Sequence, residues 1–400
     1  ITESFGLLVM SNSLLKGFEV ELYTGRADGT VVGCSTEAAA ALAGFVTEPD
    51  CRNLEYITAP EASYSKQLEQ LLEPRRRLRR WLEPRGLTLL PGSTMSLGDS
   101  GRFERSDSQN PYHSYIEATY GTRVVTASVH INLGLDNPEQ IFAACRLLRC
   151  EAALLLALSA SSPFLDGKPT GAHSQRWLQF PITPTLVPLF TSHGHYMAWM
   201  ETQLSNGNMR NVRHLWSSVR PNGPDRPKLL NRVELRICDL ITNPNELLAI
   251  TAFAELRLLQ LLEMPSQHDP LFASKLSPEE LQLLADSNDR AAASSSLNAT
   301  LMHWRDGAEI NAREWLLNQL AQLRSWPAAA PFLPLLSPLD GLLLNGNTAM
   351  VWLEKFQAGE SISAIVGADA QAMAKEEKEQ KEEKEQGVSL KAANNDGYLG

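Results

Sequence analysis

Acidic side chains recur two residues apart in segments whose hydrophobic pattern alternates. Glu19 and Glu21 lie in GFEVELYTG, and Glu234 lies two residues before Arg236 in NRVELR. Residues two apart on a β-strand point to the same face and are separated by roughly 6.6 Å along the strand. Two carboxylates at that spacing repel each other unless a cation lies between them. The spacing therefore predicts strand faces that bind cations.

Two further polar positions extend this pattern to four segments. Glu55 lies in LEYIT, and His130 lies in VHIN. Carboxylate oxygens with one imidazole and no thiolate suit Mg²⁺ or Mn²⁺ better than structural zinc. Arginines beside such metals are typical of phosphoryl-transfer sites, where they neutralise charge that develops on the transferred group. The candidate arginines are Arg123, Arg176, Arg220 and Arg236.

Each of these residues also has an ordinary structural explanation. A single E-x-E pair on a strand usually marks a solvent-exposed face. His130 taken alone is more typical of a hydrogen-bonded sheet residue, and Arg236 is equally suited to be the ion-pair partner of Glu234. Matched acidic or histidine positions on four alternating segments favour a metal-lined sheet face over these interpretations.

Alternation of apolar and polar residues predicts the strands that carry these side chains. The predicted strands are residues 18–23, 54–58, 124–133 and 232–238, and the predicted helices are 138–159, 246–262 and 309–323. These elements do not form a regular βαβ series. We therefore expect an α+β fold with a curved, mainly antiparallel sheet and helices on one face. Residues 287–296 and 327–338 are expected to be connecting loops.

The chain is expected to contain one large domain over residues 15–358. An N-terminal extension over residues 1–14 precedes it, with Met10 as a candidate start, and a tail over residues 359–400 follows it. Residues 375–386 read KEEKEQKEEKEQ and contain no apolar side chain. Such a run cannot bury surface to offset chain entropy, so it predicts a frayed solvated helix or disorder in the tail.

The composition of the chain argues against some classes of protein. The 400 residues carry 46 acidic and 36 basic side chains, and this net charge of −10 argues against a nucleic-acid binder. The most apolar stretch, residues 147–165, is interrupted by Arg149 and Glu151, so we expect no membrane span. Five cysteines without a C-x-x-C pair suit free thiols, and we therefore expect a cytoplasmic protein.

Several segments, taken together, resemble the glutamate–cysteine ligases of the cyanobacterial type. These enzymes belong to a carboxylate–amine ligase group with a glutamine-synthetase-like catalytic fold. The matching stretches are GFEVELYTG (17–25), EPDCRNLEYITAP (48–60), PGSTMSLGDS (91–100), NPYHSYIEATYGTRVVTASVHINLGL (110–135), ALSASSPFLDGKPTGAHSQRW (157–177), TSHGHYMAW (191–199), NVRHLWSSVRPNG (211–223) and NRVELRICDLITNP (231–244). They occur in the same order over about residues 15–320.

The resemblance implies a reaction and its cofactors. ATP phosphorylates the side-chain carboxylate of L-glutamate, and the amine of L-cysteine then displaces phosphate to give γ-glutamylcysteine. This is the first step of glutathione biosynthesis. The implied cofactors are ATP and Mg²⁺, with Mn²⁺ as a substitute, and the implied partners are small-molecule substrates.

The same resemblance implies roles for the candidate residues. The implied metal ligands are Glu19, Glu21, Glu55, His130 and Glu234, with Glu48 as an additional loop candidate. Arg236 resembles the arginine that stabilises the transferred phosphoryl group, and Arg220 resembles a contact to ATP phosphate or that group. Arg176 resembles the residue that binds a glutamate carboxylate, and Asn132 and Arg123 are further substrate-binding candidates.

Other activities fit the same residues. A ligase of the same mechanism would join glutamate to a different amine, because amine choice depends on loops. A metal-dependent amide hydrolase would use the carboxylates without ATP. A non-catalytic module would bind metal or glutamate without turnover. The sequence does not predict the oligomeric state.

Overall fold

The computed structural model describes the backbone of residues 13–395 and the side chains up to Glu379. Most of the predicted N-terminal extension, including Met10, lies outside the described residues. The strands are β1 (Lys16–Gly25), β2 (Phe45–Thr47), β3 (Asn53–Ile57), β4 (Thr88–Leu90), β5 (Val129–Gly134), β6 (Phe164–Leu165), β7 (Lys168–Pro169), β8 (Val219–Asn222), β9 (Arg232–Leu235), β10 (Thr300–Met302) and β11 (Glu309–Asn311).

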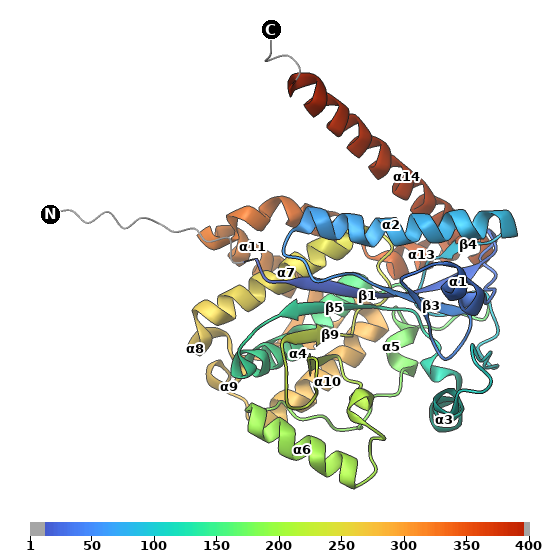
Figure 1. The fold of residues 1–400 in the computed structure, drawn as a ribbon. Coiled ribbons are helices and arrows are strands. Elements are labelled where there is room, and N and C mark those ends of the chain that lie inside the picture. The colour runs from blue at the N-terminus through green and yellow to red at the C-terminus, as the bar shows by residue number, and fades with distance from the viewer. Residues whose placement is uncertain (1–12, 396–400) are drawn as a thin grey trace.

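Helices make up most of the remaining structure (Figure 1). The α-helices are α1 (Ser35–Ala41), α2 (Tyr64–Leu82), α3 (Pro111–Tyr120), α4 (Pro138–Ser159), α5 (Gln175–Gln179), α6 (His193–Ser205), α7 (Pro244–Glu263), α8 (Pro265–His268), α9 (Pro270–Ala273), α10 (Pro278–Ser295), α11 (Ala312–Ser325), α12 (Ser337–Asn345), α13 (Thr348–Gln357) and α14 (Ile362–Asn395). The 3₁₀-helices are η1 (Glu83–Arg85), η2 (Gly121–Val124), η3 (Val212–His214), η4 (Ser296–Asn298) and η5 (Pro327–Leu336).

A seven-stranded antiparallel sheet forms the centre of the fold, in the order β2-β3-β1-β5-β9-β8, with β4 also paired to β1. The expected α+β class with an antiparallel sheet is therefore confirmed. β1 is the longest strand and pairs with three others, so it fixes the register of the sheet. Of the predicted strand over residues 124–133, only β5 is extended. Residue 124 ends η2 instead, and residues 125–128 form no continuous strand.

Alternation along these strands gives the sheet one apolar and one polar face. Phe18, Val20 and Leu22 of β1 are buried in the hydrophobic core, together with the apolar side chains of β3, β5 and β9. The intervening residues of β1, Glu19 and Glu21, point to the other face. Burial of the apolar set therefore determines where the acidic side chains lie.

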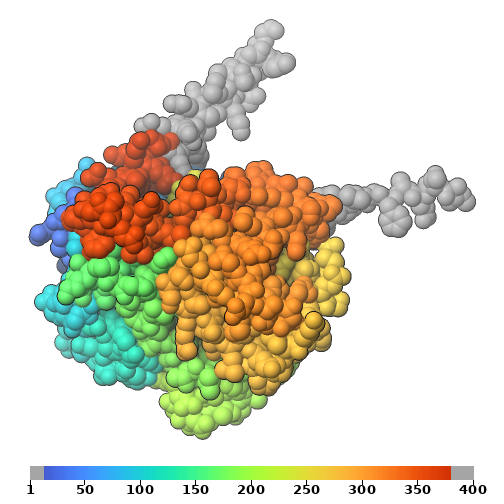
Figure 2. Space-filling view, turned by 180° about the vertical axis from the view of Figure 1, so that it is seen from behind, coloured from blue at the N-terminus to red at the C-terminus, as the bar shows by residue number. Residues whose placement is uncertain are grey.

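Two long helices pack against the apolar side of the sheet and against each other. α4 contacts β8, β9 and α7, and nearly every side chain on its last four turns is buried. Asn137 and Asn243 cap the N-termini of α4 and α7, each directly before a proline at the first helical position. Seen from behind, the later helices, coloured yellow to orange, cover this side of the molecule (Figure 2).

Two segments predicted as loops are helical. Residues 287–296 fall almost entirely in α10, whose N-terminus carries a capping box formed by Ser277 and Glu280. Residues 327–338 form η5 and the start of α12. Small and polar residues suggested loops, but packing of α10 against α4 and of η5 against α7 overrides that local preference. The predicted helix 309–323 starts later, because residues 309–311 pair as β11 and Asn311 caps α11.

The predicted disordered tail begins instead as a packed helix. α14 starts at Ile362 and contacts α13, α2 and β4. Ile365, Val366 and Met373 are buried, and the buried carboxylate of Glu377 accepts hydrogen bonds from Arg79. The expectation was wrong for this part because the apolar residues precede the charged run and give α14 a face that packs on the core.

By length and apolar composition alone, residues 327–357 could form a helix that crosses a membrane. In the structure the run is divided among η5, α12 and α13, and 33% of its most apolar window is buried. Leu336, Leu339 and Trp352 pack into the hydrophobic clusters. A broken helix does not pair all of its backbone groups internally, as a lipid-exposed span requires. The expected absence of a span stays a prediction.

A buried carboxylate ties the core helices together. Glu151 of α4 accepts hydrogen bonds from Arg257 of α7 at 2.8 and 3.0 Å, from Trp304 at 3.0 Å and from Gln319 of α11 at 3.0 Å. Burial alone would raise the pKa of Glu151, but Arg257 and these donors lower it. Glu151 therefore links α4, α7 and α11 inside the core.

We expect Glu151→Ala to lower the free energy of unfolding by about 3–5 kcal/mol, because it leaves Arg257 charged and buried without its carboxylate partner. Urea unfolding followed by circular dichroism measures this loss. Glu201→Ala, at an exposed position on α6, is the matched control and should change the value by less than about 0.5 kcal/mol. Equal stability of the two variants would contradict the structural role of Glu151.

Candidate active site

A cavity of about 350 Å³ opens at the polar face of the sheet. Its lining combines acidic, basic and aromatic side chains. The acidic residues are Glu19, Glu21, Glu48, Asp50 and Glu55, and the basic ones are His130, Arg176, Arg213, Arg220 and Arg236. The aromatic residues are Phe103, Tyr112, His113, Phe180 and Trp216. Such a lining suits a ligand with both anionic and apolar parts.

Antiparallel register brings the acidic residues together. Glu21 of β1 lies directly opposite Glu55 of β3, and Glu19 lies opposite His130 of β5. On the other side of β5, Asn132 lies opposite Glu234 of β9. Directly opposed residues in an antiparallel pair have Cβ atoms about 5 Å apart. Positions far apart in the sequence therefore meet in a space that a small cation can bridge.

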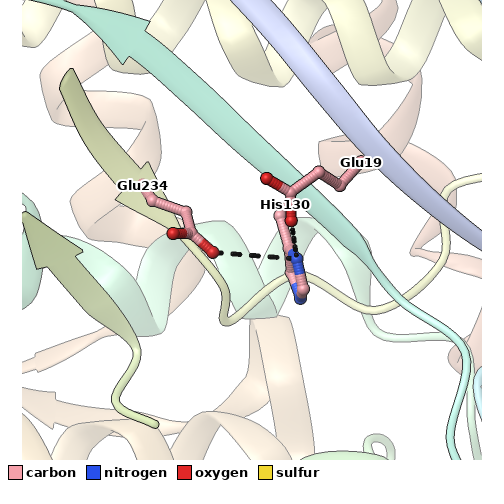
Figure 3. Close-up of side chains that lie close together, drawn as sticks. All are labelled: Glu19, His130 and Glu234. Atoms are coloured by element: carbon pink, nitrogen blue, oxygen red, sulfur yellow. Dashed lines mark hydrogen bonds and ion pairs between the residues drawn. The ribbon is translucent and has the colours of Figure 1, made fainter. Parts of the chain in front are cut away.

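Glu19, His130 and Glu234 form the tightest group (Figure 3). Each offers one possible ligand atom, and these atoms all lie within 4.8 Å of one another. His130 Nδ1 lies 2.9 Å from Glu19 Oε2 and 3.8 Å from Glu234 Oε1. Burial alone would raise the pKa of Glu19, but the hydrogen bond with His130 and nearby positive charge lower it.

The hydrogen bonds around His130 leave one ring nitrogen suited to a metal. Nδ1 donates to Glu19, because a carboxylate oxygen only accepts hydrogen bonds. Ser128 Oγ lies 3.2 Å from Nε2, but its hydroxyl donates to Glu21 Oε2 at 2.7 Å. Nε2 therefore keeps a lone pair without a donor, as in histidines whose second nitrogen binds metal.

Glu234 is a fully buried carboxylate surrounded by donors. Arg220 binds it through two nitrogens at 2.7 and 2.9 Å, Arg236 Nη1 lies 2.6 Å away, and Asn222 Nδ2 also lies 2.6 Å away. Burial alone would raise the pKa of Glu234, but the two arginines hold it well below its usual range. Glu234 therefore stays charged and fixes both guanidinium groups beside the cavity.

The two arginines differ in the hydrogen-bonding groups that they leave free. Arg220 also donates from Nη1 to the carbonyls of Arg213 and Leu215, so most of its N–H groups are used. Burial lowers its pKa to about 10, which leaves it charged at neutral pH. Arg236 contacts its neighbours only through Nη1, so its Nε and Nη2 remain able to donate to a ligand.

Four carboxylates of the cavity have no arginine in hydrogen-bond contact. They are Glu19, Glu21, Glu48 and Glu55. Burial, followed by the charges of Glu48 and Glu21, raises the pKa of Glu55 to about 10, and burial and Glu21 raise the pKa of Glu48 to about 7. These shifts show that the pocket has excess negative charge. Oxygen donors with one free imidazole nitrogen fit Mg²⁺ or Mn²⁺.

Arg123 does not reach this cavity, which corrects its prediction as a substrate-binding residue there. It is exposed, donates to the carbonyl of Tyr120 at 3.3 Å and lines a separate cavity. It lies in η2, directly before the point where a strand was predicted to begin. Asn132 lies beside the cavity and donates to Glu19 Oε1 at 3.3 Å.

Arg176 lines the cavity from α5 and is buried. Nη1 and Nη2 donate to the carbonyls of Ile237 and Arg236 at 3.0 and 2.9 Å, so the side chain holds the segment that follows β9. Its Nε has no hydrogen-bond partner among the described residues. An unsatisfied buried donor in a cavity wall is suited to bind an anionic ligand.

Sequence reasoning missed the aromatic wall. Tyr112 comes from α3, Phe180 follows α5, and Trp216 precedes β8, so no periodic pattern marks them as neighbours. Glu48, considered only as an additional candidate, lies in the loop after β2 and is hydrogen-bonded to Glu55. Asn222 was also missed, although its alternation with Arg220 on β8 places both on the face of Glu234.

The sequence pattern of glutamate–cysteine ligase family 2 (GCS2) matches residues 15–382. The chain belongs to this family. GCS2 proteins are ATP-dependent carboxylate–amine ligases. The expected family is thus confirmed at this level, whereas the cyanobacterial type stays a prediction.

Individual GCS2 relatives align over part of their length. A "Putative glutamate--cysteine ligase 2" of Sorangium cellulosum is 33% identical over 129 residues, 32% of this chain and 33% of that protein. A "Putative glutamate--cysteine ligase 2-1" of Mycolicibacterium vanbaalenii is 27% identical over 248 residues, 58% of this chain and 63% of that protein. The chain therefore aligns with less than two thirds of each of these two relatives.

Solved structures share the fold. The glutamate–cysteine ligase of Francisella tularensis in complex with AMP has a TM-score of 0.71 at 15% identity, covering 91% of this chain and 89% of that one. A bifunctional glutathione synthetase from Pasteurella multocida has a TM-score of 0.69 at 15% identity, covering 92% of this chain and 53% of that one. The expected glutamine-synthetase-like fold is therefore confirmed.

We expect Glu55→Gln to weaken Mn²⁺ binding by about tenfold or more, because a bound cation makes the Glu55 carboxyl lose its proton and become a charged donor, whereas an amide stays neutral. Isothermal titration of the protein with Mn²⁺ measures this change. Glu37→Gln, at an exposed position on α1, makes the same chemical change away from the cavity and should leave the affinity unaltered. Equal affinities of the two variants would contradict a cation site at Glu55.

Proposed function

We propose that the protein joins the γ-carboxylate of L-glutamate to the amine of L-cysteine with cleavage of ATP to ADP. One observation carries the proposal: in a GCS2-family chain, four carboxylates without arginine partners and two arginines fixed by Glu234 line one cavity. Carboxylates of this kind hold divalent cations, and free guanidinium donors bind phosphoryl oxygens. The same cavity therefore has the two kinds of group that phosphoryl transfer needs.

The residues fall into three roles in this proposal. Glu19, Glu21, Glu48, Glu55 and the free nitrogen of His130 would hold Mg²⁺, with Glu234 at the edge of the group. Bound Mg²⁺ supplies charge neutralisation at the phosphate oxygens. Each of these side chains is anchored on the sheet or beside it, so the cation positions are fixed before the substrates bind.

The arginines act on the substrates. Arg236 directs Nε and Nη2 at the phosphoryl group that moves from ATP to glutamate, while Glu234 holds its Nη1. Arg220 positions Glu234 and offers its remaining N–H to phosphate. Arg176 donates from Nε to a glutamate carboxylate, and Asn132 supports Glu19 beside the bound substrate.

The aromatic wall excludes water from the activated glutamate. Phe103, Tyr112, Phe180 and Trp216 line the same cavity as the acidic residues. An acyl phosphate hydrolyses if water reaches it before the amine does, so an apolar cover favours ligation. The same wall borders the place where the amine substrate must approach.

The reaction is tested directly by supplying ATP, Mg²⁺, L-glutamate and L-cysteine. We expect ADP and γ-glutamylcysteine in equal amounts, measured by a coupled ADP assay and by mass spectrometry. Omission of ATP should abolish product, whereas an amide hydrolase would turn over without nucleotide. ADP formation with another amine but not with cysteine would keep the ligase mechanism and overturn the cysteine assignment.

We expect Arg236→Ala to reduce turnover by about 100-fold or more, because it removes the two guanidinium nitrogens, Nε and Nη2, that this proposal assigns to the phosphoryl group. Arg80→Ala, at an exposed position on α2, removes an arginine far from the cavity and should retain full turnover. Glu21→Gln should also lower turnover strongly, through loss of a cation ligand. Near-normal rates in Arg236→Ala, with an unchanged melting temperature, would show that its assigned role is wrong.

A further inference from the structure

A second and larger cavity, of about 990 Å³, lies beside the first. Residues 177–187, which include the end of α5, form one side of it, and α3, α6 and α10 contribute the others. α5 and α10 pack against each other (Figure 1). Phe180 lines both cavities, so one aromatic ring forms part of the wall between them. The proposed ligase reaction assigns no role to this second space.

Two buried polar atoms in its wall have no partner. Asp289 of α10 is 3% exposed, and its Oδ1 forms no hydrogen bond with a described residue. Trp177 of α5 is 4% exposed, and its Nε1 likewise forms none. Leaving a buried donor or acceptor unsatisfied costs about 1–3 kcal/mol. A ligand that supplies a donor to Asp289 and an acceptor to Trp177 would remove both costs.

The cavity contains one buried acid without an ion pair and two exposed arginines. Asp286 is paired with Arg149 at 2.8 Å, whereas Asp289 forms no ion pair with a described side chain and is hydrogen-bonded to Ser218. Burial and the charge of Asp286 raise the pKa of Asp289 to about 8, so its carboxyl is largely protonated at neutral pH. Arg123 and Arg290 are exposed and form no ion pair with a described side chain. A ligand ammonium would thus favour the ionised form of Asp289, and a ligand carboxylate would pair with the two arginines.

The remaining wall is aromatic and apolar. Tyr115, Tyr120, Phe180 and Trp199 contribute rings, and Ile182 contributes an aliphatic surface. Aromatic faces attract cations and bury apolar groups, so this lining complements an ammonium group attached to an apolar body. Inorganic anions and simple metal ions would leave the apolar lining unused.

We propose that this cavity binds a zwitterion with an apolar side chain, either a free α-amino acid or a short peptide. The ligand's ammonium group lies at Asp289, its carboxylate lies toward Arg123 and Arg290, and its side chain packs on the rings. The inference rests on the second cavity alone and does not depend on the proposed ligase reaction. It also gives Arg123 a binding role outside the cavity for which it was predicted.

Isothermal titration of the full chain with L-phenylalanine and with L-phenylalanylglycine tests the proposal and separates the two sources. We expect at least one of them to bind, and phenethylamine and 3-phenylpropionate, which each carry one charge, to bind at least tenfold more weakly. Asp289→Asn should weaken binding of the zwitterion at least tenfold. Absence of binding by both zwitterions would overturn the proposal.

Matched variants test whether the ligand binds in the second cavity. Arg290→Gln, at an exposed position that carries no risk to folding, should weaken binding about threefold, and Arg80→Gln should leave it unchanged. Glu21→Gln alters only the first cavity and should leave the affinity unchanged. Loss of binding in Glu21→Gln, or unchanged binding in both Asp289→Asn and Arg290→Gln, would overturn the site.

Discussion

The cavity depends on one constraint. Packing of the sheet holds several carboxylates close together although they repel each other. Burial of Phe18, Val20 and Leu22 contributes roughly 5–9 kcal/mol, at about 1.5–3 kcal/mol for each side chain. Two charges roughly 6.6 Å apart repel by about 2.5 kcal/mol at an effective dielectric constant of 20. Packing therefore wins, and Glu19 and Glu21 are held on the opposite face although they repel. A divalent cation turns that repulsion into attraction.

The same face contains a second and opposite arrangement. Arg220 and Arg236 neutralise the charge of Glu234, so Glu234 adds no free negative charge to the cavity. Instead, it holds these two guanidinium groups in place. Its neighbour across β5, Glu19, is bound by His130 and Asn132 and by no arginine among the described residues. The sheet thus separates a region that needs metal ions from a region that supplies guanidinium groups. A polyphosphate that spans the two regions contacts both.

Residues on regular strands could be placed from the sequence, whereas residues on loops could not. Alternation predicts that Glu19 and Glu21 share a face and that Glu55, His130 and Glu234 lie on similar strands, and the resemblance implies that all five bind metal. The register that brings these side chains together depends on pairing between strands about 100 residues apart in the sequence, which no local pattern encodes.

Local patterns failed where tertiary packing decides. The Ser- and Ala-rich residues 287–296 suggested a loop, but α10 is stabilised by its capping box and its contact with α4. The strand predicted from residue 124 begins only at Val129, because the chain forms η2 first.

The central claim is tested most directly by a crystal soaked in Mn²⁺, with anomalous diffraction recorded at the manganese edge. The account predicts a peak within coordination distance of Glu19, Glu21 or Glu55 and of His130. Manganese bound only elsewhere on the surface would contradict it.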